Sequence, residues 1–84
     1  MIKLLVPIAF VLLNCKLGSE QSVIGQLKQI EPVKEVSGTF GSYDILAKIE
    51  CPNNHELNSV ITNKIRNLEL VRGTLTLMGI DGQR

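Results

Sequence analysis

Residues 4–13 read LLVPIAFVLL, a run that contains no polar or charged side chain. A strand buried on both faces has this unbroken Val/Ile/Leu pattern, whereas a strand with one solvated face alternates. The run is too short to cross a bilayer as a helix, which needs about 20 apolar residues. We therefore predict a central β-strand from Leu5 to Cys15, with Pro7 at its entry because proline cannot donate to a central ladder.

The same run has an alternative interpretation, as the apolar core of a secretory signal ahead of a lipid-modified cysteine. Lys3 precedes the run and Cys15 follows it, as in such signals. Leu13 and Asn14, however, stand where a cleavage site needs small residues. We therefore favour the strand. Without a signal, the chain is expected in the cytoplasm, where thiols stay reduced.

Length and composition indicate one small globular domain over residues 1–84. Hydrophobic residues make up 44% of the chain and charged residues 20%, which argues against disorder. The net charge is +1 and aromatic residues are 4% of the total. No direct nucleic-acid or membrane surface is therefore expected. Two cysteines are too few for a disulfide-rich scaffold or a Cys-based zinc site.

The pattern after the first strand predicts two helices and three more strands. Ser19 is a suitable N-cap for a helix that Pro32 ends. Asn53, with Glu56 three residues later, predicts the start of a second helix. The apolar stripes of the two helices are Val23, Ile24, Leu27 and Ile30, and then Leu57, Val60, Ile61, Ile65 and Leu68. Strands are expected over residues 33–40, 43–51 and 70–78, with a two-residue hairpin turn at Gly41-Ser42 and a loose tail over 79–84.

The element order β-α-β-β-α-β predicts a ferredoxin-like α+β sandwich with strand order 4-1-3-2. Both helices then cover one face of the sheet. The other face must also be apolar, because the first strand has no polar side. Monomers rarely expose an apolar patch of more than roughly 600 Å². We therefore expect a homodimer that packs through the open face by two-fold symmetry.

Three motifs occur in this order along the chain: LGSE at 17–20, GSYD at 41–44 and VRGTLTL at 71–77. With the element pattern, they resemble the effector-binding, carboxy-terminal RAM domain of the Lrp/AsnC transcriptional regulators, over roughly Pro7–Met78. The most specific element is Gly41-Ser42-Tyr43-Asp44, which matches a Gly-x-Tyr-Asp hairpin. Thr74-Leu75-Thr76 matches a Thr-x-Thr pattern in the last strand.

The resemblance implies dimers that pack through their sheets, rings of dimers (often octamers) and amino-acid binding between dimers. The 84 residues leave no room for the helix-turn-helix of full-length members, so the sequence resembles the stand-alone RAM proteins. Direct DNA binding is therefore not expected, and a full-length Lrp/AsnC regulator is the expected partner. Two other classes remain open: a small dimeric α/β-barrel monooxygenase or isomerase, and an ACT-like domain, which has the same element order.

The expected ligand-binding residues are Gly41, Ser42, Tyr43, Asp44, Thr74 and Thr76. A free amino acid needs N–H donors for its carboxylate and an acceptor for its ammonium. Gly41 allows close approach to backbone N–H groups, and Asp44 can pair with the ammonium. The threonines offer hydroxyls. Each residue also has an ordinary use, in turns for Gly and Asp and in strands for Thr, and Tyr43 can equally pack in the dimer interface.

No cofactor, metal or catalytic group is expected. His55 is the single histidine, and it has no catalytic or metal-binding partners beside it in the sequence. Cys15 and Cys51 are expected at opposite edges of the sheet as two free thiols, because each ends one of two antiparallel neighbours. Asp81-Gly82 lacks the other ligands of a calcium loop, and no phosphate-binding glycine pattern is present.

Overall fold

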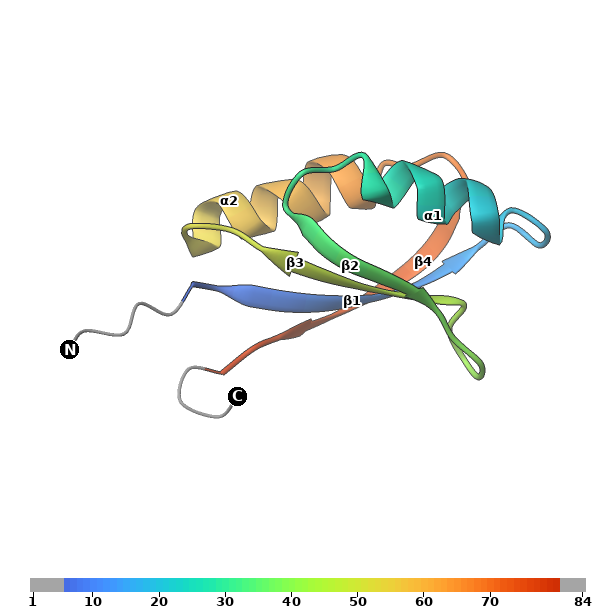
Figure 1. Ribbon diagram of the computed structural model, residues 1–84, viewed down its shortest axis with the longest axis horizontal. Coiled ribbons are helices and arrows are strands. Elements are labelled where there is room, and N and C mark those ends of the chain that lie inside the picture. The colour runs from blue at the N-terminus through green and yellow to red at the C-terminus, as the bar shows by residue number, and fades with distance from the viewer. Residues whose placement is uncertain (1–5, 81–84) are drawn as a thin grey trace.

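The computed structural model describes residues 6–80, whose elements follow the predicted order (Figure 1). These are β1 (Ile8–Cys15), α1 (Glu20–Lys28), β2 (Val33–Gly38), β3 (Ile45–Glu50), α2 (Asn54–Ser59), the π-helical segment η1 (Val60–Ile65) and β4 (Val71–Met78). The sheet order is β2-β3-β1-β4, and neighbouring strands are antiparallel. The predicted ferredoxin-like topology is confirmed. The strand start predicted at Leu5 and the Asp81-Gly82 pair lie outside the described residues.

The first strand is central, as predicted. β1 pairs with β3 on one side and with β4 on the other. Ala9, Val11, Leu13 and Cys15 are buried on the helix side of the sheet. The alternate residues face away from the helices, so both faces of β1 need apolar side chains. Within the described residues, no helix is long and apolar enough to cross a membrane.

Both helices lie over the same face of the sheet and close the core (Figure 1). Fully buried side chains on that side include Leu27, Leu57 and Ile65. Asn53 caps α2 as predicted, because its Oδ1 accepts a hydrogen bond from the Glu56 N–H at 2.8 Å. Ser19 does occupy the N-cap position of α1, but its hydroxyl donates to the Lys16 carbonyl instead of accepting from the helix.

The second helix differs from the predicted regular α-helix. After Ser59 it continues as the π-helical η1, and the Arg66 N–H donates to the Ile61 carbonyl, five residues back, at 3.0 Å. The predicted apolar stripe is nevertheless buried, at Leu57, Val60, Ile61 and Ile65. A π-helical turn holds one more residue than an α-helical turn. The apolar spacing in the sequence does not reveal this extra residue.

The predicted two-residue turn at Gly41-Ser42 is wrong. β2 ends at Gly38 and β3 begins at Ile45, so residues 39–44 form a longer loop. The Thr39 N–H donates to the Asp44 carbonyl at 2.9 Å, and the Thr39 hydroxyl donates to the Tyr43 carbonyl at 2.7 Å. These bonds close the loop from within. Gly41 has a φ of +117°, a left-handed conformation that favours glycine.

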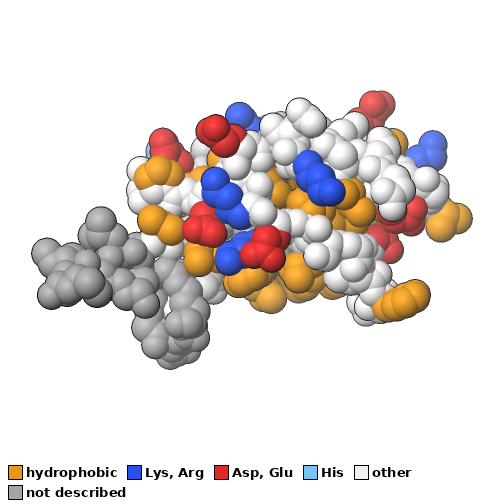
Figure 2. Space-filling model, in the orientation of Figure 1, with side chains coloured by type: hydrophobic (Ala, Val, Ile, Leu, Met, Phe, Trp, Pro, Cys, Tyr) orange, Lys and Arg blue, Asp and Glu red, His pale blue; other side chains and the backbone are white. Residues whose placement is uncertain are grey.

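The open face of the sheet is apolar only in part. Phe10, Leu75 and Leu77 are exposed there, beside Leu12 and Leu46, which pair with residues of the same face. Figure 2 shows hydrophobic side chains along the lower edge of the molecule, on the side away from the helices. We name Phe10, Leu12, Leu46, Leu75 and Leu77 the open-face patch.

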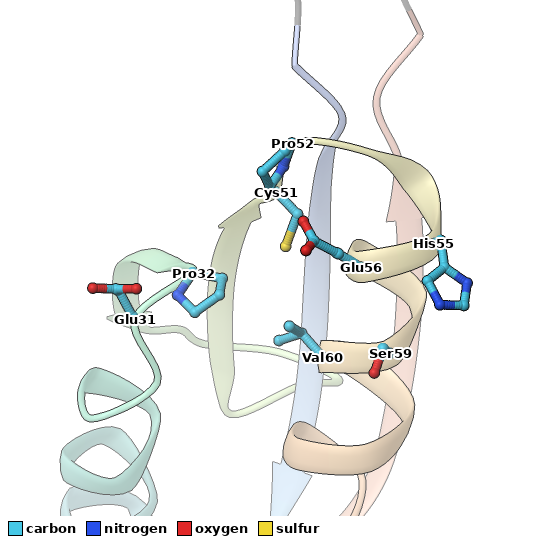
Figure 3. A pocket seen from close by; sticks show the side chains of 8 residues that line it. All are labelled: Glu31, Pro32, Cys51, Pro52, His55, Glu56, Ser59 and Val60. Carbon is cyan, nitrogen blue, oxygen red and sulfur yellow. The ribbon is translucent and has the colours of Figure 1, made fainter.

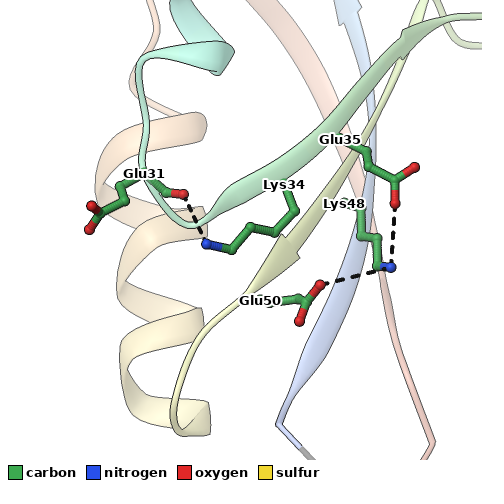
Figure 4. Close-up of polar contacts among 5 residues, drawn as sticks. All are labelled: Glu31, Lys34, Glu35, Lys48 and Glu50. Atoms are coloured by element: carbon green, nitrogen blue, oxygen red, sulfur yellow. Dashed lines mark hydrogen bonds and ion pairs between the residues drawn. The ribbon is translucent and has the colours of Figure 1, made fainter.

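The half of the open face toward β2 is charged, which corrects the expectation of a wholly apolar face. Lys48 Nζ lies 3.4 Å from a Glu35 carboxylate oxygen and 3.8 Å from one of Glu50 (Figure 4). In a regular strand, Val71 would lie on the same face as Leu75 and Leu77. It pairs instead with Cys15 and packs against the core, because the β1–β4 register shifts between Asn14 and Cys15.

Candidate ligand-binding site

Three connections meet at one end of the sheet. Leu13 of β1 pairs with Ile45, the first residue of β3, and Cys15 pairs with Val71, the first residue of β4. The turn after β1, loop 39–44 and the connection into β4 therefore lie at the same end. In Figure 1 the β1–α1 turn and the β2–β3 loop project from this end, opposite the two termini.

Asp44 is bound to the end of β1 by its backbone and by its side chain. Its N–H donates to the Leu13 carbonyl at 2.9 Å, and its Oδ2 accepts from the Cys15 N–H at 3.0 Å. The Cys15 thiol lies 3.9 Å from the same oxygen. Within residues 6–80, Oδ1 of Asp44 accepts no hydrogen bond. Oδ2 thus joins loop 39–44 to the end of β1, and Oδ1 remains available as a hydrogen-bond acceptor.

The rest of the GSYD motif lies on the surface beside Asp44. Gly41 and Ser42 are exposed and Tyr43 is half-buried. Two large apolar side chains accompany them at this end of the molecule: Phe40 is 106% exposed and Leu17 is 93% exposed. In the isolated protomer both side chains therefore lie almost wholly in water.

The structure separates the predicted threonines from Asp44. Thr74 pairs with Leu13 and Thr76 with Val11, on the helix side of β4. Loop 39–44 leads into β3, on the other side of β1. Thr74 on β4 is therefore separated from β3 by two interstrand spacings, each of about 4.8 Å. Within one protomer, Thr74 and Thr76 therefore lie across β1 from the four predicted residues of loop 39–44.

Thr74 instead lines a cavity of about 210 Å³ with Arg66, Val71, Arg72 and Gly73. Neither arginine was among the expected ligand-binding residues. A signal was present: Arg66 directly follows Ile65 of the second apolar stripe, and Arg72 is the second residue of the strand that carries Thr-x-Thr. We name these five residues the arginine cavity.

A larger cavity, of about 550 Å³, lies at the opposite end, near the start of α2. Figure 3 shows the Glu56 carboxylate and the Cys51 thiol pointing into it, whereas the His55 ring points away from Cys51. Burial, and after it the charge of Glu56, raises the pKa of the Cys51 thiol, and Lys34 lowers it by a smaller amount. A thiol of this kind is a poor nucleophile. Within the described residues, no group of three or more His, Cys, Asp or Glu side chains is placed to hold a metal ion.

Cys15 and Cys51 are free thiols at opposite ends of β1, as predicted. Cys15 is the last residue of β1, whereas the Cys51 N–H donates to the carbonyl of Pro7, just before β1 begins. Cys15 lies eight residues further along the extended chain than Pro7. At about 3.3 Å per residue, that length far exceeds the Cα separation of a disulfide, about 7 Å at most.

The Lrp/AsnC ligand binding domain matches residues 8–81 of the sequence. The chain belongs to this family. FL11, an HTH-type transcriptional regulator of Pyrococcus abyssi, is 37% identical over 71 residues, which are 84% of this chain and 46% of FL11. The chain thus spans about half the length of the curated regulator that it matches. This Lrp/AsnC domain is therefore a regulatory domain.

Two further proteins are similar to this chain, one over almost its whole length and one over a small part of its length. The crystal structure of FFRP-DM1 superposes with a TM-score of 0.86 and 32% identity, over 88% of this chain and 99% of that chain. A homocitrate synthase of Saccharolobus islandicus is 46% identical over 55 residues, which are 66% of this chain but only 12% of the enzyme. So small a part of an enzyme does not transfer its chemistry to this Lrp/AsnC domain.

Proposed function

We propose that this Lrp/AsnC domain binds a small amino acid or a related metabolite between two dimers and regulates transcription through partner proteins. The observation that carries the proposal is the placement of exposed apolar side chains in two separate regions. One region is the open-face patch, and the other surrounds loop 39–44. Two apolar surfaces on one small chain suit an assembly with two kinds of contact.

The first contact is the dimer. Leu75 is 43% exposed and Leu77 is 51% exposed on the open face. Face-to-face packing of two protomers removes both from water. Full burial of an exposed apolar side chain contributes about 1.5–3 kcal/mol, and each of these half-exposed leucines contributes about half of that. The Lys48 ion pairs lie toward β2, so they suit the rim of this interface, which in other proteins is polar.

The second contact joins dimers at the end that carries Asp44. Phe40 and Leu17 flank this end with almost their whole side chains in water. A neighbouring dimer that covers them also encloses loop 39–44, and a ligand held there touches both dimers. Because such a ligand binds the assembled state better, it shifts the equilibrium toward larger assemblies, and rings such as octamers result.

The chemistry of the loop suits a zwitterionic ligand. Oδ1 of Asp44 accepts the ammonium group in a charge-assisted hydrogen bond. The exposed N–H groups of Gly41 and Ser42 donate to the carboxylate, and Tyr43 borders the ligand. Thr74 and Thr76 lie across β1, so they contact the same ligand only from a neighbouring protomer or through a longer ligand.

Calorimetry with each of the twenty amino acids, combined with light scattering, tests this proposal. We expect at least one amino acid to bind and to raise the mass of the assembly. Asp44→Asn keeps the Cys15 hydrogen bond and removes the charge, so it is expected to weaken binding at least tenfold. Glu31→Gln, an exposed carboxylate at the other end, is the control. Binding that is equal in Asp44→Asn and wild type would reject the ammonium contact.

The partner and the compartment follow from the same proposal. A full-length Lrp/AsnC regulator carries the same domain and therefore the same two contact surfaces. Mixed assemblies would change how such a regulator presents its DNA-binding domains. The free Cys15 and Cys51 thiols suit the reducing cytoplasm. Affinity capture from a cell extract that returns no regulator of this family would count against the partnership.

A further inference from the structure

The arginine cavity has the lining of an anion site. Arg66 and Arg72 contribute permanent positive charge, Thr74 contributes a hydroxyl, and none of the lining residues is acidic. We infer that this cavity binds a small oxyanion, the carboxylate or the phosphate group of a ligand. The cavity shares Thr74 with the proposed amino-acid site, but the inference does not require Asp44, which lies across β1.

The two guanidinium groups are uncommitted within the described residues. Neither Arg66 nor Arg72 forms an ion pair or a side-chain hydrogen bond with any of residues 6–80. Lys48, in contrast, is held by two carboxylates at 3.4 and 3.8 Å. An arginine side chain offers five N–H donors in a planar fork that matches carboxylate and phosphate oxygens. Two such forks at one cavity form a receptor for an oxyanion.

Backbone irregularities place these residues at the cavity. The bond from the Arg66 N–H to the Ile61 carbonyl widens the last helical turn, which shifts Arg66 around the helix axis. On β4 the register shifts so that Asn14 pairs with Gly73 and Cys15 with Val71, and Arg72 has no partner on β1. Bulges of this kind redirect a side chain away from the regular pleat.

The backbone beside the arginines is accessible. A Cβ atom added at Gly73 would meet no atom within 4 Å, so a ligand can approach the chain closely there. The cavity volume of about 210 Å³ has room for one small anion. It lies below the range of roughly 300–1,000 Å³ that drug-sized ligands occupy. A single carboxylate or phosphate group therefore fits better than a whole nucleotide.

Equilibrium dialysis with radiolabelled inorganic phosphate, and in parallel with radiolabelled acetate, tests this inference at constant ionic strength. We expect saturable binding of at least one of the two anions, with one site per chain. Arg66→Gln and Arg72→Gln should each weaken it about tenfold, since each removes a charge-assisted contact. Both side chains are exposed, so both variants should fold, which circular dichroism verifies. Tighter binding of phosphate identifies a phosphoryl ligand, and tighter binding of acetate identifies a carboxylate.

Lys64→Gln is the matched control. Lys64 is exposed in the last turn of η1 and does not line the cavity, yet its substitution removes the same charge. Its binding should stay within twofold of wild type. The inference is overturned if neither anion binds saturably, or if Lys64→Gln weakens binding as much as the arginine variants do. Asp44→Asn should leave anion binding intact, so failure of the anion site and failure of the Asp44 ammonium contact give different results.

Discussion

The carboxylate of Asp44 accepts a hydrogen bond from the backbone N–H of Cys15 at 3.0 Å, across 29 positions of sequence. This bond fixes loop 39–44 to the last residue of β1. The same side chain is the proposed partner of a ligand ammonium group. Oδ2 therefore has a structural role and Oδ1 has the proposed binding role. Substitutions of Asp44 can separate the two.

Asp44→Ala should destabilise the domain by about 1–3 kcal/mol, because the Cys15 N–H loses its acceptor in a partly buried position. Asp44→Asn retains an acceptor oxygen and should cost less. Urea unfolding at a fixed chain concentration measures both, since assembly also stabilises the fold. Equal stability of Asp44→Ala and wild type would show that the hydrogen bond has no structural importance.

Leu75→Glu should shift the protein from dimer toward monomer. Leu75 is 43% exposed and pairs with Leu12 in the open-face patch, so two-fold symmetry would bury a carboxylate in each half of the interface. Light scattering should then give a mass near 9.3 kDa at micromolar concentration. Gln21→Glu adds the same charge on an exposed position of α1 and serves as the control. A dimer that persists unchanged in Leu75→Glu would place the interface elsewhere.

Phe40→Ser should dissociate larger assemblies into dimers without loss of fold. Phe40 is fully exposed in the protomer, so its replacement creates no core cavity. Contact between dimers would lose about 1.5–3 kcal/mol for each buried phenylalanine. Analytical ultracentrifugation with and without bound amino acid measures the change. Rings that remain intact in Phe40→Ser would exclude loop 39–44 from the contact between dimers.

The free energy of unfolding should fall as the pH rises above 9.0, the usual pKa of the Cys51 thiol. Burial and the Glu56 carboxylate raise the pKa of this thiol in the folded chain. Above pH 9.0 the unfolded chain therefore loses the proton first, and unfolding becomes more favourable. Denaturation of wild type and Cys51→Ala at pH 7 and pH 10 measures the difference. Between pH 7 and pH 10, the free energy of unfolding should fall more in wild type than in Cys51→Ala.

Glu56→Gln supplies an independent readout of the same effect. Removal of the carboxylate should lower the pKa of Cys51 and speed its alkylation by iodoacetamide, because the thiolate is the reactive form. Glu69→Gln, an exposed carboxylate on the connection into β4, is the control. An unchanged alkylation rate in Glu56→Gln would show that Glu56 does not raise this pKa.

Local patterns predicted most of the fold. The apolar run ending at Leu13 identified the central strand, and Asn53 with Glu56 identified the start of α2. The motif Gly41-Ser42-Tyr43-Asp44 identified the family, although not the length of its own loop. Thr39 closes that loop with bonds to Tyr43 and Asp44, and side-chain bonds of this kind leave no periodic signal.

The sequence by itself determined which segments are strands and helices and which strand is central. The reason is that the spacing of apolar residues along the chain follows which side chains are buried. Only the tertiary structure decided which side chains meet. It placed Arg66 beside Arg72 through a widened helical turn and a shift in strand register. It also placed Asp44 and Thr74 on opposite sides of β1. Such neighbours depend on how separate elements pair and pack, and no spacing along the chain encodes that geometry.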